Sequence, residues 1–247
     1  MKKQIHFILG VGEVGSAIKK ILERKVELFW YDTNTKIKSR LPVSKNQRID
    51  VLHIVIPYSR SFIKTIDRYK KQYRPKLIVN HSTVEMGVTQ KLGTNAVHSP
   101  ILGQHNDLYR QIKVFRKAIG ANNKTAQKLA KKYLTEYFKL EFYSSSKTTE
   151  LAKLISLSRF ALQIHFAKYC EKLCKKTGTK YEESYTMFSK LYNDGYKKLK
   201  QEQFIQPLLY PPSGKIGGSC VIPGVKKTQK ILKDKSLQEI LESNKEN

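Results

Sequence analysis

The chain has 247 residues, of which 40% are hydrophobic, together with a formal net charge of +27 and only three cysteines. No stretch stays apolar over the roughly 20 residues that a membrane span requires, and three cysteines in a chain of this length exclude a disulfide framework. We therefore expect a cytoplasmic protein without a membrane partner, large enough to bury one sizeable core beside a smaller second unit.

The positive charge would suit a polyanionic partner such as nucleic acid. It comes mostly from lysine spread along the whole chain, and no zinc-finger, RRM or KH signature accompanies it. A solvated lysine surface is therefore favoured over a nucleic-acid function. Cys170 and Cys174 lack a matching Cys or His pair, so we interpret them as small buried residues and expect no metal site.

Strand-like and helix-like segments alternate over residues 1–146, as is typical of an α/β domain with a parallel sheet covered by helices. The predicted strands cover residues 4–9, 26–31, 50–56, 76–80, 95–98, 113–119 and 140–143. Helices are predicted over residues 14–24 and 124–138. We expect a Rossmann-type N-terminal domain from this order.

Residues 147–205 predict an α-helical domain. The segment Thr148–Lys176 contains neither Gly nor Pro, which predicts one long helix of about 40 Å. Apolar side chains on several of its sides indicate burial against the sheet domain or a second copy, so we expect a homodimer through this helix. Residues 206–247 are expected to form a Gly/Pro-rich loop with a cysteine motif, then a basic tail with a helix over 236–242.

A glycine pattern lies between the first predicted strand and the first predicted helix, at Gly10-Val11-Gly12-Glu13-Val14-Gly15. This setting makes the dinucleotide-binding pattern informative. The first glycine permits a tight turn, the second lets a pyrophosphate approach the backbone, and the third lets helix and strand pack closely. Unpaired N–H groups at the helix start would then face the phosphates. We expect NAD to bind along Gly10, Gly12, Glu13, Val14 and Gly15.

Asp32 ends the second predicted strand, at the distance from the glycine turn where a carboxylate accepts hydrogen bonds from a ribose. An acid at this position repels a 2′-phosphate and favours NAD over NADP. The nearby cations Lys36, Lys38 and Arg40 weaken that preference. The alternative interpretation is a structural glycine turn beside a surface aspartate.

Six segments, including the glycine turn, form a pattern that runs over nearly the whole chain. They are Gly10–Gly15, Asp50–Pro57, Ser82–Val84, Phe115–Gly120, Glu150–Lys153 and Gly217–Pro223. Together they resemble the UDP-glucose/GDP-mannose dehydrogenase family, within the wider group of 6-phosphogluconate and β-hydroxyacid dehydrogenases. The last segment is the most specific, because Gly-Gly-Ser-Cys before an apolar-Pro step is similar to the nucleophile loop of that family.

The resemblance implies roles for individual residues. Cys220 would attack an aldehyde formed by the first hydride transfer, and a second NAD would oxidise the adduct to a thioester that water cleaves, which is chemistry that suits a thiolate. Lys153 would steady the developing oxyanion. Thr83 would lie near the nicotinamide and a catalytic water, and Pro57 and Ser82 would join the cofactor-binding set.

The sequence also departs from the family pattern. Leu157 stands where an asparagine is expected and Gly224 where an aspartate is expected, while Ile101 and His105 occupy the positions of two glutamates. The chain ends 27 residues after Cys220, where the family continues into another α/β domain. We therefore expect an incomplete catalytic set and a nucleotide-sugar site that this chain does not complete alone.

Three functional hypotheses follow. The first is an NAD-dependent oxidoreductase acting on a hydroxyl of a sugar, nucleotide-sugar or small hydroxy-acid, limited to the first hydride transfer. The second is a nonenzymatic NAD-binding or regulatory module, and the third is a β-hydroxyacid dehydrogenase with Lys153 as acid and base. Cys220 and Lys153 have structural alternatives as a buried cysteine and a surface lysine. His98 and His105 could replace a lost acid or base, or could be structural.

Overall fold

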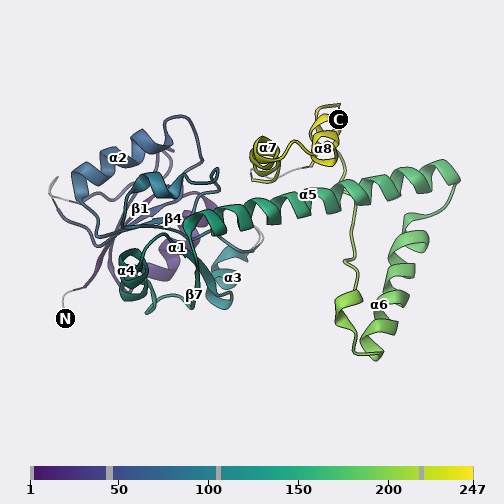
Figure 1. The fold of residues 1–247 in the computed structure, drawn as a ribbon, viewed down its shortest axis with the longest axis horizontal. Helices are drawn as coiled ribbons and strands as arrows, with labels where there is room; N and C mark the ends of the chain where they lie inside the picture. Colours follow the sequence, from purple (N-terminus) through teal and green to yellow (C-terminus); the bar gives the residue numbers. More distant parts are fainter. Residues whose placement is uncertain (1–2, 43–46, 104–106, 217–219, 247) are drawn as a thin grey trace. The chain divides into compact units, whose positions relative to one another are not determined.

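The computed structural model describes residues 3–42, 47–103, 107–216 and 220–246. The chain divides into two compact units, Met1–Lys153 and Leu154–Asn247 (Figure 1). The sequence placed the end of the sheet domain at residue 146. Within the described ranges no helix has both the length and the apolar character needed to cross a membrane.

The first unit contains a seven-stranded sheet in the order β2-β1-β3-β4-β5-β6-β7. The strands are β1 (Ile5–Leu9), β2 (Glu27–Tyr31), β3 (Val51–Ile54), β4 (Leu77–Asn80), β5 (Ala96–His98), β6 (Lys117–Ala121) and β7 (Leu140–Tyr143). The chain passes from β1 outward to β2 and then returns to β3 on the other side of β1. The ends of β1 and β3 are therefore a topological switch point, where ligands bind in open α/β sheets. The predicted α/β fold class is confirmed.

Two strands, β6 and β7, run opposite to the other five and depart from the predicted parallel sheet. β6 pairs with β5 in the antiparallel sense, whereas every other neighbouring pair is parallel. The predicted strand over 113–119 is wrong at its start, because Lys113 and Val114 belong to α3 (Leu108–Val114). α3 has seven residues and spans only about 10 Å, which is too short to carry the chain back across the sheet. β6 therefore begins at the edge of the sheet where β5 ends.

Helices cover both faces of the sheet. One face packs against α1 (Glu13–Leu22), α3 and α4 (Lys124–Leu134), and the other packs against α2 (Phe62–Tyr73) and the 3-10 helix η1 (Thr89–Leu92). The sequence did not predict α2, although its buried residues recur at helical spacing, as Phe62, Ile66, Tyr69 and Tyr73.

The second unit is helical. It contains most of α5 (Ser146–Thr177), the π-helix η3 (Glu182–Met187), α6 (Phe188–Lys198), the 3-10 helix η4 (Glu202–Phe204), α7 (Val221–Ile231) and α8 (Lys235–Glu246). The long helix matches the sequence prediction within two residues at each end. α7 occupies part of the region expected to be a loop and tail, and it buries Val221 and Val225 against Leu157 and Ile240 of the same unit.

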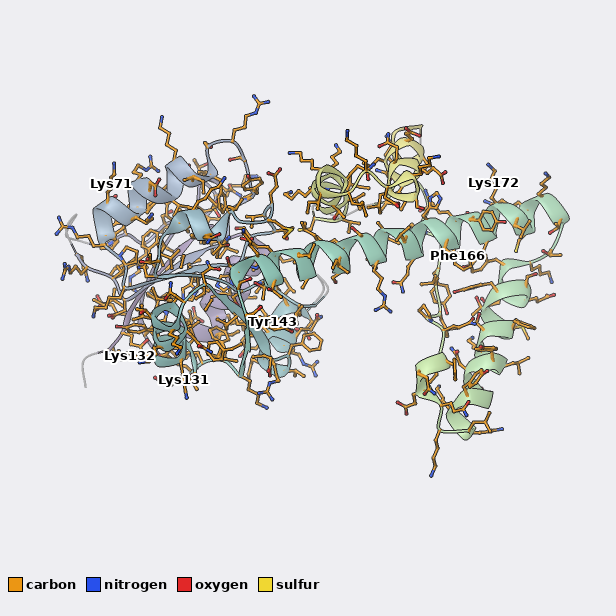
Figure 2. All side chains as sticks on the ribbon, viewed as in Figure 1. Lys71, Lys131, Lys132, Tyr143, Phe166 and Lys172 are labelled. Atoms are coloured by element: carbon orange, nitrogen blue, oxygen red, sulfur yellow. The ribbon has the colours of Figure 1, made fainter. Side chains whose placement is uncertain are left out.

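Lysine side chains project from helices of both units, and four of them are labelled in Figure 2. Lys71 on α2, Lys131 and Lys132 on α4 and Lys172 on α5 are all exposed. α4 carries no acidic residue in its first turn and two lysines in its last turn. Such a distribution matches the solvated lysine surface that the composition favours.

Candidate cofactor and catalytic site

The glycine turn joins β1 to α1, as the sequence predicts, and each glycine has a separate steric reason. Gly10 has φ +95°, and a Cβ there would lie 2.5 Å from the carbonyl oxygen of Val55. A Cβ on Gly15 would collide with the carbonyl oxygen of Gly10. A Cβ on Gly12 would meet no protein atom within 4 Å. The first and third glycines are therefore required by the fold, whereas the second leaves open space beside the backbone.

The start of α1 supplies backbone donors beside that space. Gly12 is the N-cap residue and no side chain caps this helix end, while Glu13 and Val14 form its first turn. Gly12 and Glu13 are exposed. Uncapped N–H groups and the positive end of the helix dipole favour an anion. Open space and a helix start without a side-chain cap together fit a pyrophosphate group.

Asp32 follows β2 directly and is tied to the glycine turn. Its Oδ2 accepts a hydrogen bond from the Val11 backbone N–H at 2.6 Å, and its Oδ1 accepts one from the Asn34 N–H at 2.8 Å. The side chain is half-buried. Arg40, one of the cations that weaken the preference for NAD, stacks its guanidinium carbon 5.4 Å from the Phe29 ring centre. The carboxylate therefore has a fixed orientation next to the turn.

The loops after β3 and β4 meet at the same edge of the sheet. The Ser82 hydroxyl donates to the carbonyl oxygen of Ile56 at 2.7 Å, and the Ser82 N–H donates to Asn80 Oδ1 at 3.1 Å. Pro57 is exposed at this edge and Thr83 is half-buried. Because the carboxyl ends of parallel strands share one edge, Gly10, Asp32, Pro57 and Ser82 all lie at the edge that the topology assigns to a ligand.

Two charged residues at the start of α5 are anchored to loops of the sheet unit. Glu150 is buried, and its carboxylate accepts hydrogen bonds from the N–H groups of Gly87 at 2.6 Å and Thr89 at 2.8 Å. Burial raises the pKa of Glu150. Lys153 donates from Nζ to the carbonyl oxygen of Ile101 at 2.8 Å. The sequence prediction named Lys153 and missed the anchoring role of Glu150, whose signal is a carboxylate in the opening turns of an apolar helix.

His98 has a structural environment. It is fully buried, Nδ1 lies 2.9 Å from Thr149 Oγ1, and Nε2 lies 3.3 Å from the carbonyl oxygen of Ser82. Burial lowers its pKa to about 3. Both ring nitrogens thus contact protein groups, which favours the structural alternative over an acid or base. His105 lies outside the described residues.

Cys220 is the N-cap residue of α7 in the second unit and is half-buried. The preceding residues of its motif, 217–219, lie outside the described residues. Lys153 is the last residue of the first unit, whereas Cys220 belongs to the second unit.

Two of the positions where the sequence departs from the family pattern, Leu157 and Gly224, contact each other. A Cβ on Gly224 would lie 2.6 Å from Leu157 Cδ1 and 3.0 Å from Leu157 Cβ. Leu157 is 8% exposed and belongs to the core cluster of α5, α7 and α8. The expected asparagine and aspartate are thus replaced by an apolar side chain and the glycine that makes room for it.

Structural comparison gives the same fold for a class of dehydrogenases. No family model and no curated protein matches the sequence. The chain superposes on UDP-D-ManNAc dehydrogenase from Pyrococcus horikoshii with a TM-score of 0.79 at 14% identity, covering 98% of this chain and 68% of that one. For a UDP-glucose dehydrogenase from Pyrobaculum islandicum the TM-score is 0.72 at 15% identity, with the same coverage.

A third similar structure is shorter. 3-Hydroxyisobutyrate dehydrogenase from Mycobacterium tuberculosis gives a TM-score of 0.70 at 13% identity, covering 98% of this chain and 92% of that one. The fold of this protein is therefore the one shared by nucleotide-sugar and hydroxy-acid dehydrogenases, in agreement with the family resemblance of its motifs.

Proposed function

We propose that this protein is an NAD-dependent oxidoreductase that oxidises a hydroxyl of a sugar, nucleotide-sugar or small hydroxy-acid. The observation that carries the proposal is the geometry of the glycine turn. Open space at Gly12, uncapped N–H groups at the start of α1 and the oriented carboxylate of Asp32 suit a diphosphate with a ribose beside it. When bound, NAD supplies a hydride acceptor.

The protein's own groups would then act on the substrate oxygen. Lys153 holds its Nζ against the carbonyl oxygen of Ile101, and in the proposed reaction its positive charge would steady the substrate oxygen while the hydroxyl proton passes to water. Thr83 and Ser82 would line the nicotinamide end of the site. Among the described residues no group of three or more His, Cys, Asp and Glu is arranged to hold a metal ion, and the proposal does not require one.

Oxidation would stop after one hydride transfer. Hydrolysis of a thioester requires an activated water, and the contact between Leu157 and Gly224 puts apolar atoms where the family resemblance implies polar groups. Cys220 would then have no acid product to release. With a substrate that turns over, the expected yield is one NADH per substrate molecule, and Cys220→Ser should leave this yield unchanged.

The test is a panel of nucleotide sugars and hydroxy acids, assayed for NADH formation. Oxidation of one substrate with one NADH per molecule supports the proposal, and a yield of two NADH contradicts the single-step restriction. NAD binding without oxidation of any member would favour the second hypothesis, a nonenzymatic NAD-binding module. That alternative also fits the apolar Leu157–Gly224 contact. A hydroxy-acid substrate together with loss of activity in Lys153→Met would favour the third.

The proposed assembly is a homodimer formed through α5. An apolar groove of about 750 Å³ lies in the second unit. Its lining includes Ile155, Leu162, Phe166, Phe188 and Leu209. Ile155 and Phe166 are 56% and 50% exposed, and exposed apolar patches of this kind mark protein interfaces. Light scattering should give twice the mass of one chain for wild type, and the mass of a single chain for Phe166→Glu. A monomeric wild-type chain would contradict the dimer.

A further inference from the structure

Three histidine rings form a continuous hydrogen-bonded row through the interior of the sheet unit. His6 Nδ1 lies 3.0 Å from His53 Nε2, and His53 Nδ1 lies 3.1 Å from His81 Nε2. At the outer end His6 Nε2 lies 2.9 Å from Gln4 Oε1, and at the inner end His81 Nδ1 lies 2.8 Å from the carbonyl oxygen of Ser99. All three rings are buried.

The strand register explains why the row crosses the sheet diagonally. His53 pairs with Ile8, two residues beyond His6 on β1, and it pairs with Val79, two residues before His81. Each step therefore moves one strand sideways and two residues along. The row starts at the amino end of β1 and ends after β4, next to Ser82 at the candidate cofactor edge.

The inner carbonyl fixes the direction of the hydrogen bonds. Since the Ser99 carbonyl only accepts, His81 Nδ1 carries a proton. A neutral His81 then accepts at Nε2 from His53 Nδ1–H, and His53 accepts from His6 in the same way. His6 Nε2 is left as an acceptor, so the Gln4 amide must turn its NH₂ toward it. With Gln4 Oε1 toward His6 instead, the row holds one additional proton.

Lys117 adds a fourth basic group on the same face of the sheet. It is 5% exposed, and its Nζ has no hydrogen-bond partner among the described residues. The same is true of the buried Ser99 hydroxyl. Burial lowers the pKa of Lys117 to about 7. The pKa of His53 is lowered mainly by burial, then by the neighbouring rings His6 and His81, and also by the charge of Lys117. We call His6, His53, His81 and Lys117 the basic cluster.

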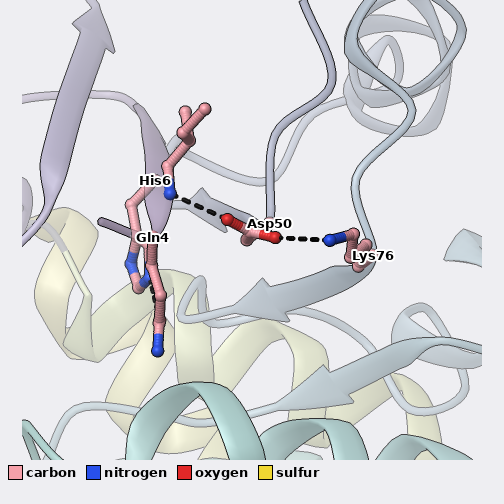
Figure 3. Close-up of polar contacts among 5 residues, drawn as sticks. Gln4, His6, Asp50 and Lys76 are labelled. Atoms are coloured by element: carbon pink, nitrogen blue, oxygen red, sulfur yellow. Dashed lines mark hydrogen bonds and ion pairs between the residues drawn. The ribbon is translucent and has the colours of Figure 1, made fainter. Parts of the chain in front are cut away.

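Other charged groups face the cluster from several elements. Asp50, before β3, accepts hydrogen bonds from the Ile5 N–H at 2.9 Å and from Lys76 Nζ at 2.8 Å (Figure 3). It opposes the effect of burial on the pKa of His6, which is lowered to about 4. Tyr137 contacts the His6 ring, His98 on β5 acts on the pKa of His81, and Lys153 on α5 acts on the pKa of His98. Lys117 thus acts on the inner end of the row, and the Asp50 carboxylate acts on the outer end.

We propose that the basic cluster is a buried site for a single proton, and that the row moves this proton between its outer end at Gln4 and its inner end at His81. A proton enters at His6 Nε2, and His6 releases its Nδ1 proton to His53 Nε2. His53 then releases its Nδ1 proton to His81 Nε2. The row then holds one additional proton, with both nitrogens of His81 protonated, and this proton leaves by the reverse steps. The Gln4 amide turns its Oε1 toward His6 Nε2 when the proton is loaded. Repulsion between like charges prevents a second proton from loading.

The position of His81 links this site to the cofactor, a step that rests on the proposed function. A proton at the inner end of the row repels the positively charged ring of an oxidised nicotinamide. It does not repel the reduced ring, which is neutral. By linkage, the reduced cofactor should favour the loaded cluster and the oxidised cofactor the empty one. Lowering the pH from 8 to 6 should therefore raise the ratio of the Kd for NAD to the Kd for NADH.

The first experiment is nuclear magnetic resonance on the chain with ¹⁵N-labelled histidine, without cofactor. At pH 8 His53 and His81 should both be neutral with the proton on Nδ1; the Nε2–H tautomer on either ring overturns the proposal, and no substitution is needed for this readout. In Lys117→Met the row should take up its proton at higher pH than in wild type. The exposed Lys113, changed to Met, is the matched control. Identical histidine titrations in the two variants would contradict a shared proton.

The second experiment measures both dinucleotides by calorimetry at pH 8 and pH 6. The Kd ratio should rise at least threefold in wild type and in Lys113→Met. It should stay constant in Lys117→Met, because Lys117, with a pKa of about 7, is the member of the basic cluster that takes up the proton between pH 8 and pH 6. A constant ratio in wild type overturns the link to the cofactor. If neither dinucleotide binds, the proposed function fails, while the tautomers still decide whether the proton site exists.

Discussion

Acidification should destabilise the sheet unit through its buried histidines. Burial lowers the pKa of His6 to about 4 and of His98 to about 3, and it lowers the pKa values of His53 and His81 as well. In the unfolded chain each ring titrates at its ordinary value of 6.5. Between pH 6.5 and the lowered value the unfolded chain binds more protons than the folded chain, so stability falls as the pH falls.

The size of this loss in the free energy of unfolding follows from the lowered pKa values of His6 and His98. Moving from pH 7 to pH 5 costs about 2 kcal/mol for each of His6 and His98, because one pKa unit corresponds to about 1.4 kcal/mol. His53 and His81 add to the loss in the same direction. Glu150 acts in the opposite direction, because burial raises its pKa and its protonation stabilises the fold as the pH falls. A loss of about 4 kcal/mol or more is a large part of the stability of a domain.

Urea unfolding at pH 7 and pH 5 measures this loss. Trp30, the one tryptophan of the chain, lies in β2 and reports the sheet unit by fluorescence. His98→Gln should reduce the loss on acidification by about 2 kcal/mol, whereas His165→Gln, in the second unit, should not change it. Equal free energies of unfolding at the two pH values, or an undiminished loss in His98→Gln, would refute the reasoning.

Two further predictions concern packing and anchoring. Gly224→Ala should destabilise the second unit by about 1–3 kcal/mol because its Cβ overlaps Leu157, and Leu157→Ala in the same chain should recover part of the loss in thermal unfolding; an unchanged Tm in the single variant would contradict the contact. Glu150→Ala should cost about 2–3 kcal/mol in urea unfolding because two N–H groups lose a charged acceptor. The exposed Glu136→Ala is its control, and equal stability of the two variants would contradict the anchoring role.

The cofactor edge could be predicted from the sequence because its signals are local. Gly10 to Gly15 lie within one turn, and their steric demands follow from a strand that leads directly into a helix. Asp32 follows the next strand, and the parallel register carries it to the same edge. The same reasoning failed at β6, since an apolar run around Val114 does not distinguish a strand from a short helix.

Other features depend on contacts that sequence spacing does not encode. Leu157 and Gly224 are 67 residues apart, and only the packing of α5 against α7 shows that the two replacements compensate each other. His6, His53 and His81 are isolated in the sequence. They form a row only because β1, β3 and β4 are neighbours with a fixed register.

Calorimetric titration with NAD tests the pyrophosphate site at the glycine turn, using two glycines at which an added Cβ would meet no protein atom. A Cβ on Gly12 or on the exposed Gly195 would have nothing within 4 Å, so Gly12→Ala and Gly195→Ala should both fold. Wild type and Gly195→Ala should bind NAD equally, and Gly12→Ala should bind at least about tenfold more weakly, a difference of about 1.4 kcal/mol. Absence of NAD binding in wild type, or equal affinity in all three chains, would contradict a pyrophosphate site at this turn.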